Sequence, residues 1–173
     1  TALCLKVEIQ SCKELREAKW VSWSYRGLST ADLTTLGTLG AVLPRLRLLM
    51  LECAGIGDAG LVALAPALRR LPALENLDLM GNPFGDKGLA ALVAPPLPAG
   101  APPPPTGGLE KLTWIDLCDT QITDAGCAAL VTALVNGVLP ALKKLYLGDK
   151  FPASAAAKGY LFIHRAGLDV LLD

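Results

Sequence analysis

The chain is poor in charge and in aromatic rings, and both shortages exclude classes of function. Charged residues make up 18% of its 173 residues, with 16 basic and 16 acidic side chains and a formal net charge of zero. Such a chain lacks the positive field that attracts nucleic acid, and aromatic residues at 5% leave few rings for stacking on bases. We therefore expect no nucleic-acid partner.

Motifs for metal binding and catalysis are also missing. The five cysteines include no pair with the close spacing of zinc ligands, and His164 is the only histidine. The sequence has no Gly-x-Ser-x-Gly elbow, Walker loop or paired-histidine site. We expect no metal, no cofactor and no enzymatic activity.

The cysteines and the hydropathy bear on location and on domain number. Unpaired, mostly buried thiols are typical of an intracellular, reducing compartment: the cytoplasm, with an organelle such as a plastid left open. No apolar run reaches the ~20 residues that span a bilayer, so we expect no transmembrane segment. At 52% hydrophobic the chain is too apolar for disorder, and its length predicts a single domain over residues 1–173.

Two linked phrases recur along the chain. The first phrase is seven residues long and has apolar residues at positions one, four and seven. Each copy of the first phrase is followed by a copy of the second phrase. Successive first phrases are 28, 28, 38 and 30 residues apart. The first phrase begins at Leu15, Leu43, Leu71, Leu109 and Leu139, and the second at Leu28, Ile56, Phe84, Ile122 and Ile163.

The spacing within the phrases predicts a strand followed by a helix. Leu49 and Leu51 are two residues apart, as on one face of a strand, whereas Leu61, Leu64 and Leu68 have helical spacing. One such unit cannot bury its apolar edge alone. Stacked units form a parallel sheet, with helices outside and one continuous core.

The phrases resemble the leucine-rich repeat family, and the 28-residue period is similar to its ribonuclease-inhibitor-like class. The Ile-x-Asp-Ala-Gly-Leu phrase also resembles the cysteine-containing class, which the longer period makes the second choice. The resemblance implies an α/β solenoid of about five repeats, with a parallel β-sheet on the concave face and helices on the convex face. Only Asn82 fills the family's asparagine position, so the side-chain amide ladder should be largely missing.

Helix boundaries can also be predicted. Ser29 and Thr123 suit N-caps, and aspartates such as Asp58 fall in first turns, where the helix dipole favours them. Pro66 should kink or split its helix. Residues 2–12 should form the helix of a repeat that begins before the chain does, which suggests a fragment or an assembly subunit.

Two insertions interrupt the period. The first, a Pro-rich insertion at 94–108, follows a helix and is either a tolerated loop or a polyproline docking ligand. The second, a rim insertion at 150–162, follows a strand and should emerge near the concave rim. It carries Phe151, Tyr160 and Phe162, which we take as candidate binding residues.

The strand residues between the leucines should form the concave face. That face would hold five acids and a single base, Lys144, together with two of the three tryptophans. Aromatic anchors among carboxylates suit a protein partner with basic and apolar groups, although the acids could also serve only to solubilise the sheet. The candidate partner-binding residues are Trp20, Ser22, Tyr25, Met50, Glu52, Asp78, Trp114, Asp116, Asp119, Tyr146, Asp149, Phe151, Tyr160 and Phe162.

The helix positions expected to face outward are almost uncharged. An apolar exterior of this kind often marks an interface, here with protein or with a membrane-embedded neighbour. The expected outward residues are Thr34, Thr35, Thr38, Val62, Ala63, Ala65, Ala90, Ala91, Ala128, Ala129, Val131, Thr132 and Val135.

The sequence therefore favours a non-catalytic protein–protein interaction module that binds through its concave face. One alternative is an accessory structural subunit stably embedded in a large complex, membrane or organellar, with several subunits as partners. The other is a GTPase-activating protein or a ubiquitin-ligase substrate adaptor. The resemblance implies that GTPase stimulation would need an arginine in a repeat loop, and only Arg26 occupies such a position.

Overall fold

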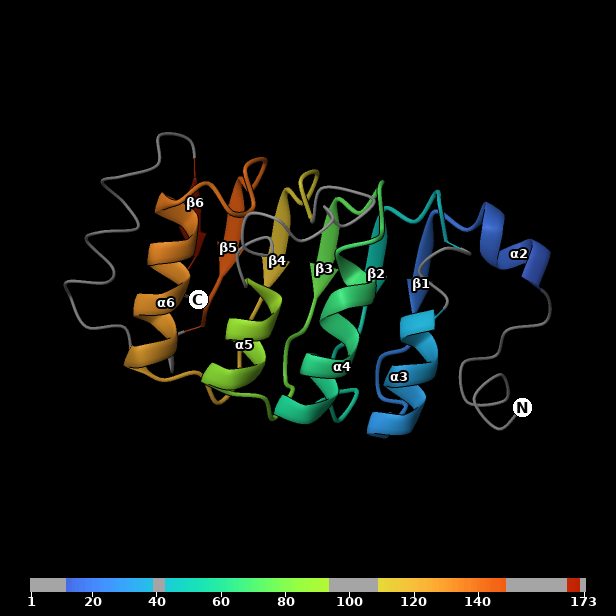
Figure 1. Cartoon of the computed structure of the whole chain (residues 1–173), viewed down its shortest axis with the longest axis horizontal. Coiled ribbons are helices and arrows are strands. Elements are labelled where there is room, and N and C mark those ends of the chain that lie inside the picture. Colours follow the sequence, from blue (N-terminus) through green and yellow to red (C-terminus); the bar gives the residue numbers. More distant parts are fainter. Residues whose placement is uncertain (1–11, 39–42, 94–108, 149–167, 172–173) are drawn as a thin grey trace, which may run out of the picture.

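The computed structural model describes residues 12–38, 43–93, 109–148 and 168–171. Within them, six short strands form one parallel sheet in chain order, and helices cover one of its faces (Figure 1). The strands are β1 (Trp20–Ser22), β2 (Leu48–Met50), β3 (Asn76–Asp78), β4 (Trp114–Asp116), β5 (Lys144–Tyr146) and β6 (Asp169–Leu171). The helices are α2 (Cys12–Glu17), α3 (Thr30–Thr38), α4 (Asp58–Leu68), α5 (Asp86–Leu92) and α6 (Asp124–Val135).

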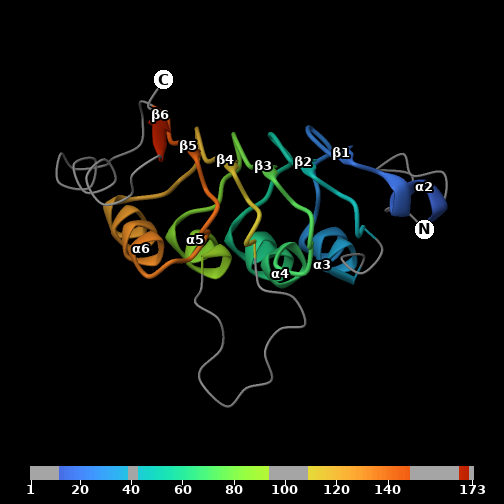
Figure 2. The same cartoon turned by 90° about the horizontal axis from the view of Figure 1, so that it is seen from above.

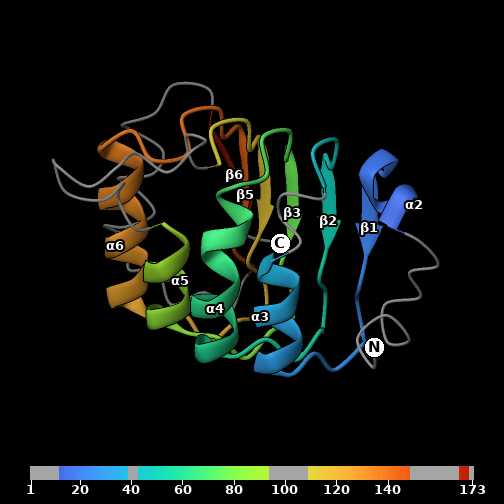
Figure 3. The same cartoon turned by 45° about the vertical axis from the view of Figure 1, so that its right-hand side comes forward.

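The strands follow a shallow arc whose hollow side faces away from α3–α6 (Figure 2). These four helices stand side by side in chain order against the other face of the sheet (Figure 3). The predicted α/β solenoid, with the sheet on the concave side and helices on the convex side, is confirmed.

The core lies between the sheet and the helices. The middle residue of each strand from β2 to β5 is buried, as are the leucines of the helices that face the sheet. Trp23, which follows β1, is also buried in this core. The core cluster draws on every repeat, so burial of apolar area is shared along the whole stack.

The last strand corrects one prediction. The second phrase predicted a helix beginning at Ile163, but Asp169–Leu171 pairs with β5 in parallel, with Asp169 opposite Lys144. Leu168 and Val170 are buried, whereas Asp169 between them is exposed. This alternation is the period of a strand, whereas the three-residue spacing of Leu168 and Leu171 also fits a helix. The described residues therefore contain a sixth strand where a fifth repeat helix was expected.

Helix starts largely follow the prediction. Ser29 and Asp32 cap α3 reciprocally, because the N–H of Asp32 donates to Ser29 Oγ and the N–H of Ser29 donates to Asp32 Oδ2. The hydroxyl of Thr123 accepts a hydrogen bond from the N–H of Ala125 and caps α6. Pro66 does not split α4, since it lies in the last turn, where its missing N–H removes only one hydrogen bond near the helix end.

Aspartates in the first turns of α4 and α5 bind the backbone of the next repeat. Asp58 Oδ1 accepts hydrogen bonds of 2.8 Å from the N–H groups of both Gly85 and Gly88. Asp86 makes the same crossing to Thr123, accepting from its N–H at 2.8 Å and from its hydroxyl at 2.6 Å. These bonds hold the pKa of Asp86 below its usual value. The aspartates thus join repeats, a role that the helix-dipole argument did not reveal.

The glycine of the Asp-x-Gly phrase makes room for this crossing. A Cβ on Gly88 would lie 3.0 Å from Asp58 Oδ1 and 3.1 Å from the Cβ of Phe84. On Gly126, a Cβ would collide with Asp86 Oδ1. The recurring phrase therefore encodes contact between neighbouring repeats as well as a helix start.

Asn82 closes the buried turn between two repeats. Its Oδ1 accepts from the N–H of Ile56 at 2.9 Å, and its Nδ2 donates to the carbonyls of Leu51 at 2.8 Å and Leu79 at 2.9 Å. At the equivalent position of the next repeat, the Thr120 hydroxyl donates only to the Leu117 carbonyl of its own turn. The single family asparagine thus cross-links two repeats in the middle of the stack.

Replacing Asn82 with alanine should destabilise the fold strongly. The change removes the Asn82 partner of the buried Ile56 N–H and of the Leu79 carbonyl, which costs about 3 kcal/mol in free energy of unfolding. Asn136→Ala, the same change at an exposed helix end, should cost less than about 1 kcal/mol. Urea unfolding followed by circular dichroism measures both, and equal losses would contradict the structural role of Asn82.

Candidate partner-binding surface

Strand register sorts the concave side chains into rows that run across the sheet. Each strand pairs in parallel with the next, so the first residues of β1–β5 form one row and the third residues form another. The middle residues point into the core, which leaves these two rows on the face away from the helices. The first row is Trp20, Leu48, Asn76, Trp114 and Lys144, and the second row is Ser22, Met50, Asp78, Asp116 and Tyr146.

Two large aromatic side chains stand open to solvent at the β1 end of this face. Trp20 is 64% exposed and Tyr25 is 68% exposed, whereas most other large apolar side chains of the described residues are buried. Trp114 and Tyr146 are half-buried, and their rings lie 5.6 Å apart at an interplanar angle of 58°. The surface therefore offers apolar rings at both of its ends.

Tyr25 is held in place in a backbone conformation that an aromatic residue rarely adopts. Its φ is 61°, and Cys53, Gly81 and Asp119 at the same turn position of later repeats also have positive φ. The N–H of Tyr25 donates to the Glu52 carbonyl at 2.9 Å, and its hydroxyl donates to Glu52 Oε1. The carboxylate raises the pKa of Tyr25 to about 12, so the phenol stays protonated at neutral pH. The ring is thus pre-positioned at the surface.

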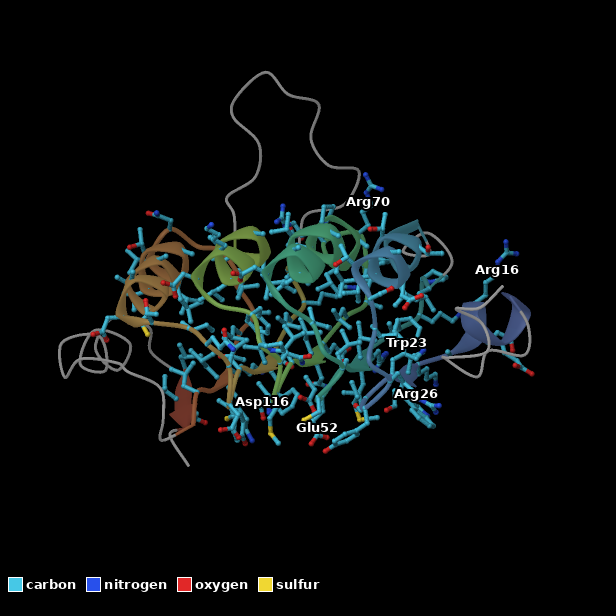
Figure 4. The ribbon with its side chains drawn as sticks, turned by 90° about the horizontal axis from the view of Figure 1, so that it is seen from below. Arg16, Trp23, Arg26, Glu52, Arg70 and Asp116 are labelled. Carbon is cyan, nitrogen blue, oxygen red and sulfur yellow. The ribbon has the colours of Figure 1, made fainter. Side chains whose placement is uncertain are left out.

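The carboxylates of this face gather where the strands end. Glu52 and Asp116 lie on the strand side, away from the helices, whereas Arg70 lies on the helix side (Figure 4). Asp78 and Asp116 are register partners on adjacent strands. Burial, and to a lesser degree the charges of Asp116 and Glu52, raise the pKa of Asp78 above its usual value.

Asp116 is less accessible than its sequence position suggested. It is only 9% exposed, and its Oδ1 accepts a hydrogen bond from the N–H of Cys118 at 2.9 Å. Burial and the neighbouring Asp116 raise the pKa of the Cys118 thiol to about 12, so this thiol is a poor nucleophile. The carboxylate serves mainly the turn after β4 and contributes to the surface through its charge.

Sequence reasoning missed a basic edge on the other side of the same face. Lys19, Arg47 and Lys143 each precede a strand and are exposed. Because all the strands are parallel, these residues lie at one edge of the sheet, opposite the edge with the carboxylates. Arg47 Nε lies 3.7 Å from Glu75 Oε1, so this basic edge is partly balanced. The sequence does contain a pattern that predicts this basic edge, because a basic residue directly precedes the strand in three of the five repeats.

The remaining candidates divide between this surface and segments outside the described residues. Ser22 and Asp119 are exposed and Met50 is half-buried on the concave side, whereas Arg26, required for the GTPase alternative, is exposed in the turn after β1. The candidates outside the described residues are Asp149, Phe151, Tyr160 and Phe162, together with both insertions, 94–108 and 150–162.

Most of the uncharged helix residues that were expected to face outward are exposed or half-buried on the convex face. Val62 on α4 is 48% exposed and Val135 on α6 is 57% exposed. Ala65 was expected to face outward but is buried, because α4 packs closely against its neighbouring helices. The other expected residues that are exposed are Thr34, Thr35, Ala90, Ala128, Ala129 and Thr132. Those that are half-buried are Ala63, Ala91 and Val131. The Thr38 side chain lies outside the described residues.

The described part of the chain has neither a cluster of metal ligands nor a membrane-spanning helix. In residues 12–38, 43–93, 109–148 and 168–171, no three or more His, Cys, Asp or Glu side chains are grouped so as to hold a metal ion. Within the same ranges, every helix is too short or too polar to cross a membrane.

Known proteins match both the repeats and the fold. A family model described as leucine-rich repeat matches residues 44–65 and 71–93, which contain β2–α4 and β3–α5. These two segments are leucine-rich repeats. A solved structure titled leiomodin-1 actin-binding site 2 has a TM-score of 0.71 to this chain at 14% identity, so the two share the solenoid fold. The match covers 94% of this chain and 86% of that one, so the likeness extends over nearly the whole solenoid.

Replacing Asp78 with asparagine should stabilise the protein at neutral pH. Asp78 has a raised pKa, so the folded state binds its proton more tightly than the unfolded state and ionisation opposes folding. The amide removes the repulsion by Asp116 and can still accept from the N–H of Met80. We expect a gain of about 0.5 kcal/mol at pH 7 that shrinks toward pH 3, below the usual range of carboxyl pKa values.

Thermal unfolding of Asp78→Asn across this pH range measures the effect. The matched control is Glu110→Gln, which removes one negative charge from an exposed turn and should change stability little at any pH. A loss of stability in Asp78→Asn at pH 7 would contradict the repulsion.

Proposed function

We propose that the chain is a protein–protein interaction module that binds its partner through the concave surface. The observation that carries this proposal is the exposure of Trp20 and Tyr25 on that surface, beside the carboxylate of Glu52. Tryptophan and tyrosine are enriched among residues that dominate binding energy, and leaving them in water is unfavourable. A partner that covers them gains this apolar area at little conformational cost, because Tyr25 is already held by Glu52.

The chemistry of the surface favours a partner with basic and apolar groups. The half-buried Asp78 is poorly solvated and lies beside two other acids, so a cation that approaches it relieves their repulsion. The likeness to a leiomodin-1 structure titled as an actin-binding site is consistent with a protein-binding role for a solenoid of this shape, but it does not assign actin to this chain.

The concave surface can be tested with a double variant, Trp20→Ala with Glu52→Lys. It removes an exposed ring and reverses a charge, and neither site is buried. Partner proteins captured by the wild-type chain should be lost, and the affinity of a purified partner should fall by at least about tenfold. Quantitative affinity capture with mass spectrometry, followed by calorimetry, measures both results.

The matched control carries the same kinds of change elsewhere, as Val62→Ala with Glu110→Lys. Both control sites are accessible, and one lies on the convex face. If the concave variant captures the same proteins in the same amounts as wild type, the concave surface is not the binding site.

The second proposal is an accessory subunit that packs into a larger assembly through the convex face. It is favoured by one observation, the exposure of Val62 and Val135 on helices with almost no outward charge. A solenoid held in this way should co-purify with its neighbours through high salt, because salt does not weaken apolar contacts.

Val62→Lys with Val135→Lys should then release the chain from the assembly. Ser22→Lys with Gln121→Lys, which adds the same charges at exposed polar sites outside the helices, is the control. Retention of the valine variant in the complex, measured by size-exclusion chromatography of extracts, would rule out this mode of assembly.

A further inference from the structure

We propose that the segment bound on the concave surface is an amphipathic α-helix that lies across the strands. Its apolar stripe would cover the first row, at Trp20, Leu48 and Trp114, and its arginine-rich stripe would cover the carboxylates of Glu52 and Asp78. This inference rests on the proposed function and goes beyond it by naming the conformation and the charge pattern of the partner.

The spacing of the first row favours a helix over an extended segment. Neighbouring strands are ~4.8 Å apart, so Trp20 and Trp114, three strands apart in register, are separated by ~14 Å across the sheet. Three helical turns advance ~16 Å, which brings one side chain over each strand. Same-side residues of an extended segment are ~6.7 Å apart, so two such steps reach Trp114 but the residue between them falls ~2 Å beyond Leu48, between two strands.

The charges of the surface fix how the helix is rolled about its axis. The first row has carboxylates on one side, at the carboxyl ends of the strands, and Lys19, Arg47 and Lys143 on the other side, at their amino ends. A helix with a basic stripe on one flank of its apolar stripe, and acidic residues on the other, meets opposite charges on both sides. The reverse roll places like charges together, which is costly when the groups are desolvated.

The carboxylate side favours arginine over lysine in the partner. Asp78 is half-buried on this face, whereas Asp116 is only 9% exposed and binds the turn after β4. A guanidinium group that approaches Asp78 can pair with its carboxylate through two parallel N–H donors, whereas an ammonium group acts as a single point charge.

Three synthetic peptides of about 18 residues, long enough to cross the ~24 Å of the sheet, test the proposal. The first has leucines at helical spacing, flanked by arginines on one side and glutamates on the other. The second has the same side chains with two central prolines that prevent a helix. The third has glutamates in place of the arginines. Titration by calorimetry and tryptophan fluorescence gives the affinity of each for the full chain.

The helical arginine peptide should bind at least about tenfold more tightly than either of the other two. Its affinity should fall by about tenfold in Trp20→Ala and in Glu52→Lys, but not in Glu110→Lys. A fourth peptide, with lysines in place of the arginines, should bind more weakly, and equal binding would overturn the preference for arginine.

Equal affinity for the helical and proline-broken peptides, or no binding by any of them, would overturn the proposed helix. Affinity that is unchanged in Trp20→Ala would overturn its placement. Neither result decides the proposed function itself, because capture of whole proteins by the concave variant and its control tests that separately.

Discussion

Every feature of this solenoid depends on the parallel, in-register stacking of its strands. A three-residue strand and one helix cannot bury their leucines alone, so each repeat is stable only against its neighbours. The polar groups that this stacking buries are satisfied across repeats as well, by Asn82 in the turn after β3 and by Asp58 at the start of α4. The contacts that hold the stack together therefore also fix the register.

Register in turn decides what the concave face presents. The middle residue of each strand must be apolar because it enters the core, whereas the residues beside it face solvent and are free to vary. In this chain that freedom places exposed aromatic rings and carboxylates in rows across one sheet, with basic residues at the opposite edge. Those rows carry both the proposed function and the proposed helical partner, because side chains far apart in sequence become neighbours at strand spacing.

The sequence predicted what periodicity controls and missed what depends on contacts between repeats. The strands and their rows follow directly from the leucine spacing. The sixth strand was missed because Leu168 and Leu171, three residues apart, also fit helical spacing in so short a run. The crossing of Asp58 to the next repeat and the burial of Asp116 depend on distances between units, which no pattern within one unit contains.

The claim that the concave face is the binding surface is tested most directly by oxidative footprinting of the full chain with and without its captured partner. Trp20 and Tyr25 are exposed and readily oxidised, and Val62 and Val135 report on the convex face. We expect the partner to protect Trp20 and Tyr25 several-fold and to leave both valines unchanged. Unchanged oxidation of both aromatic residues, with protection of the valines, would contradict the account.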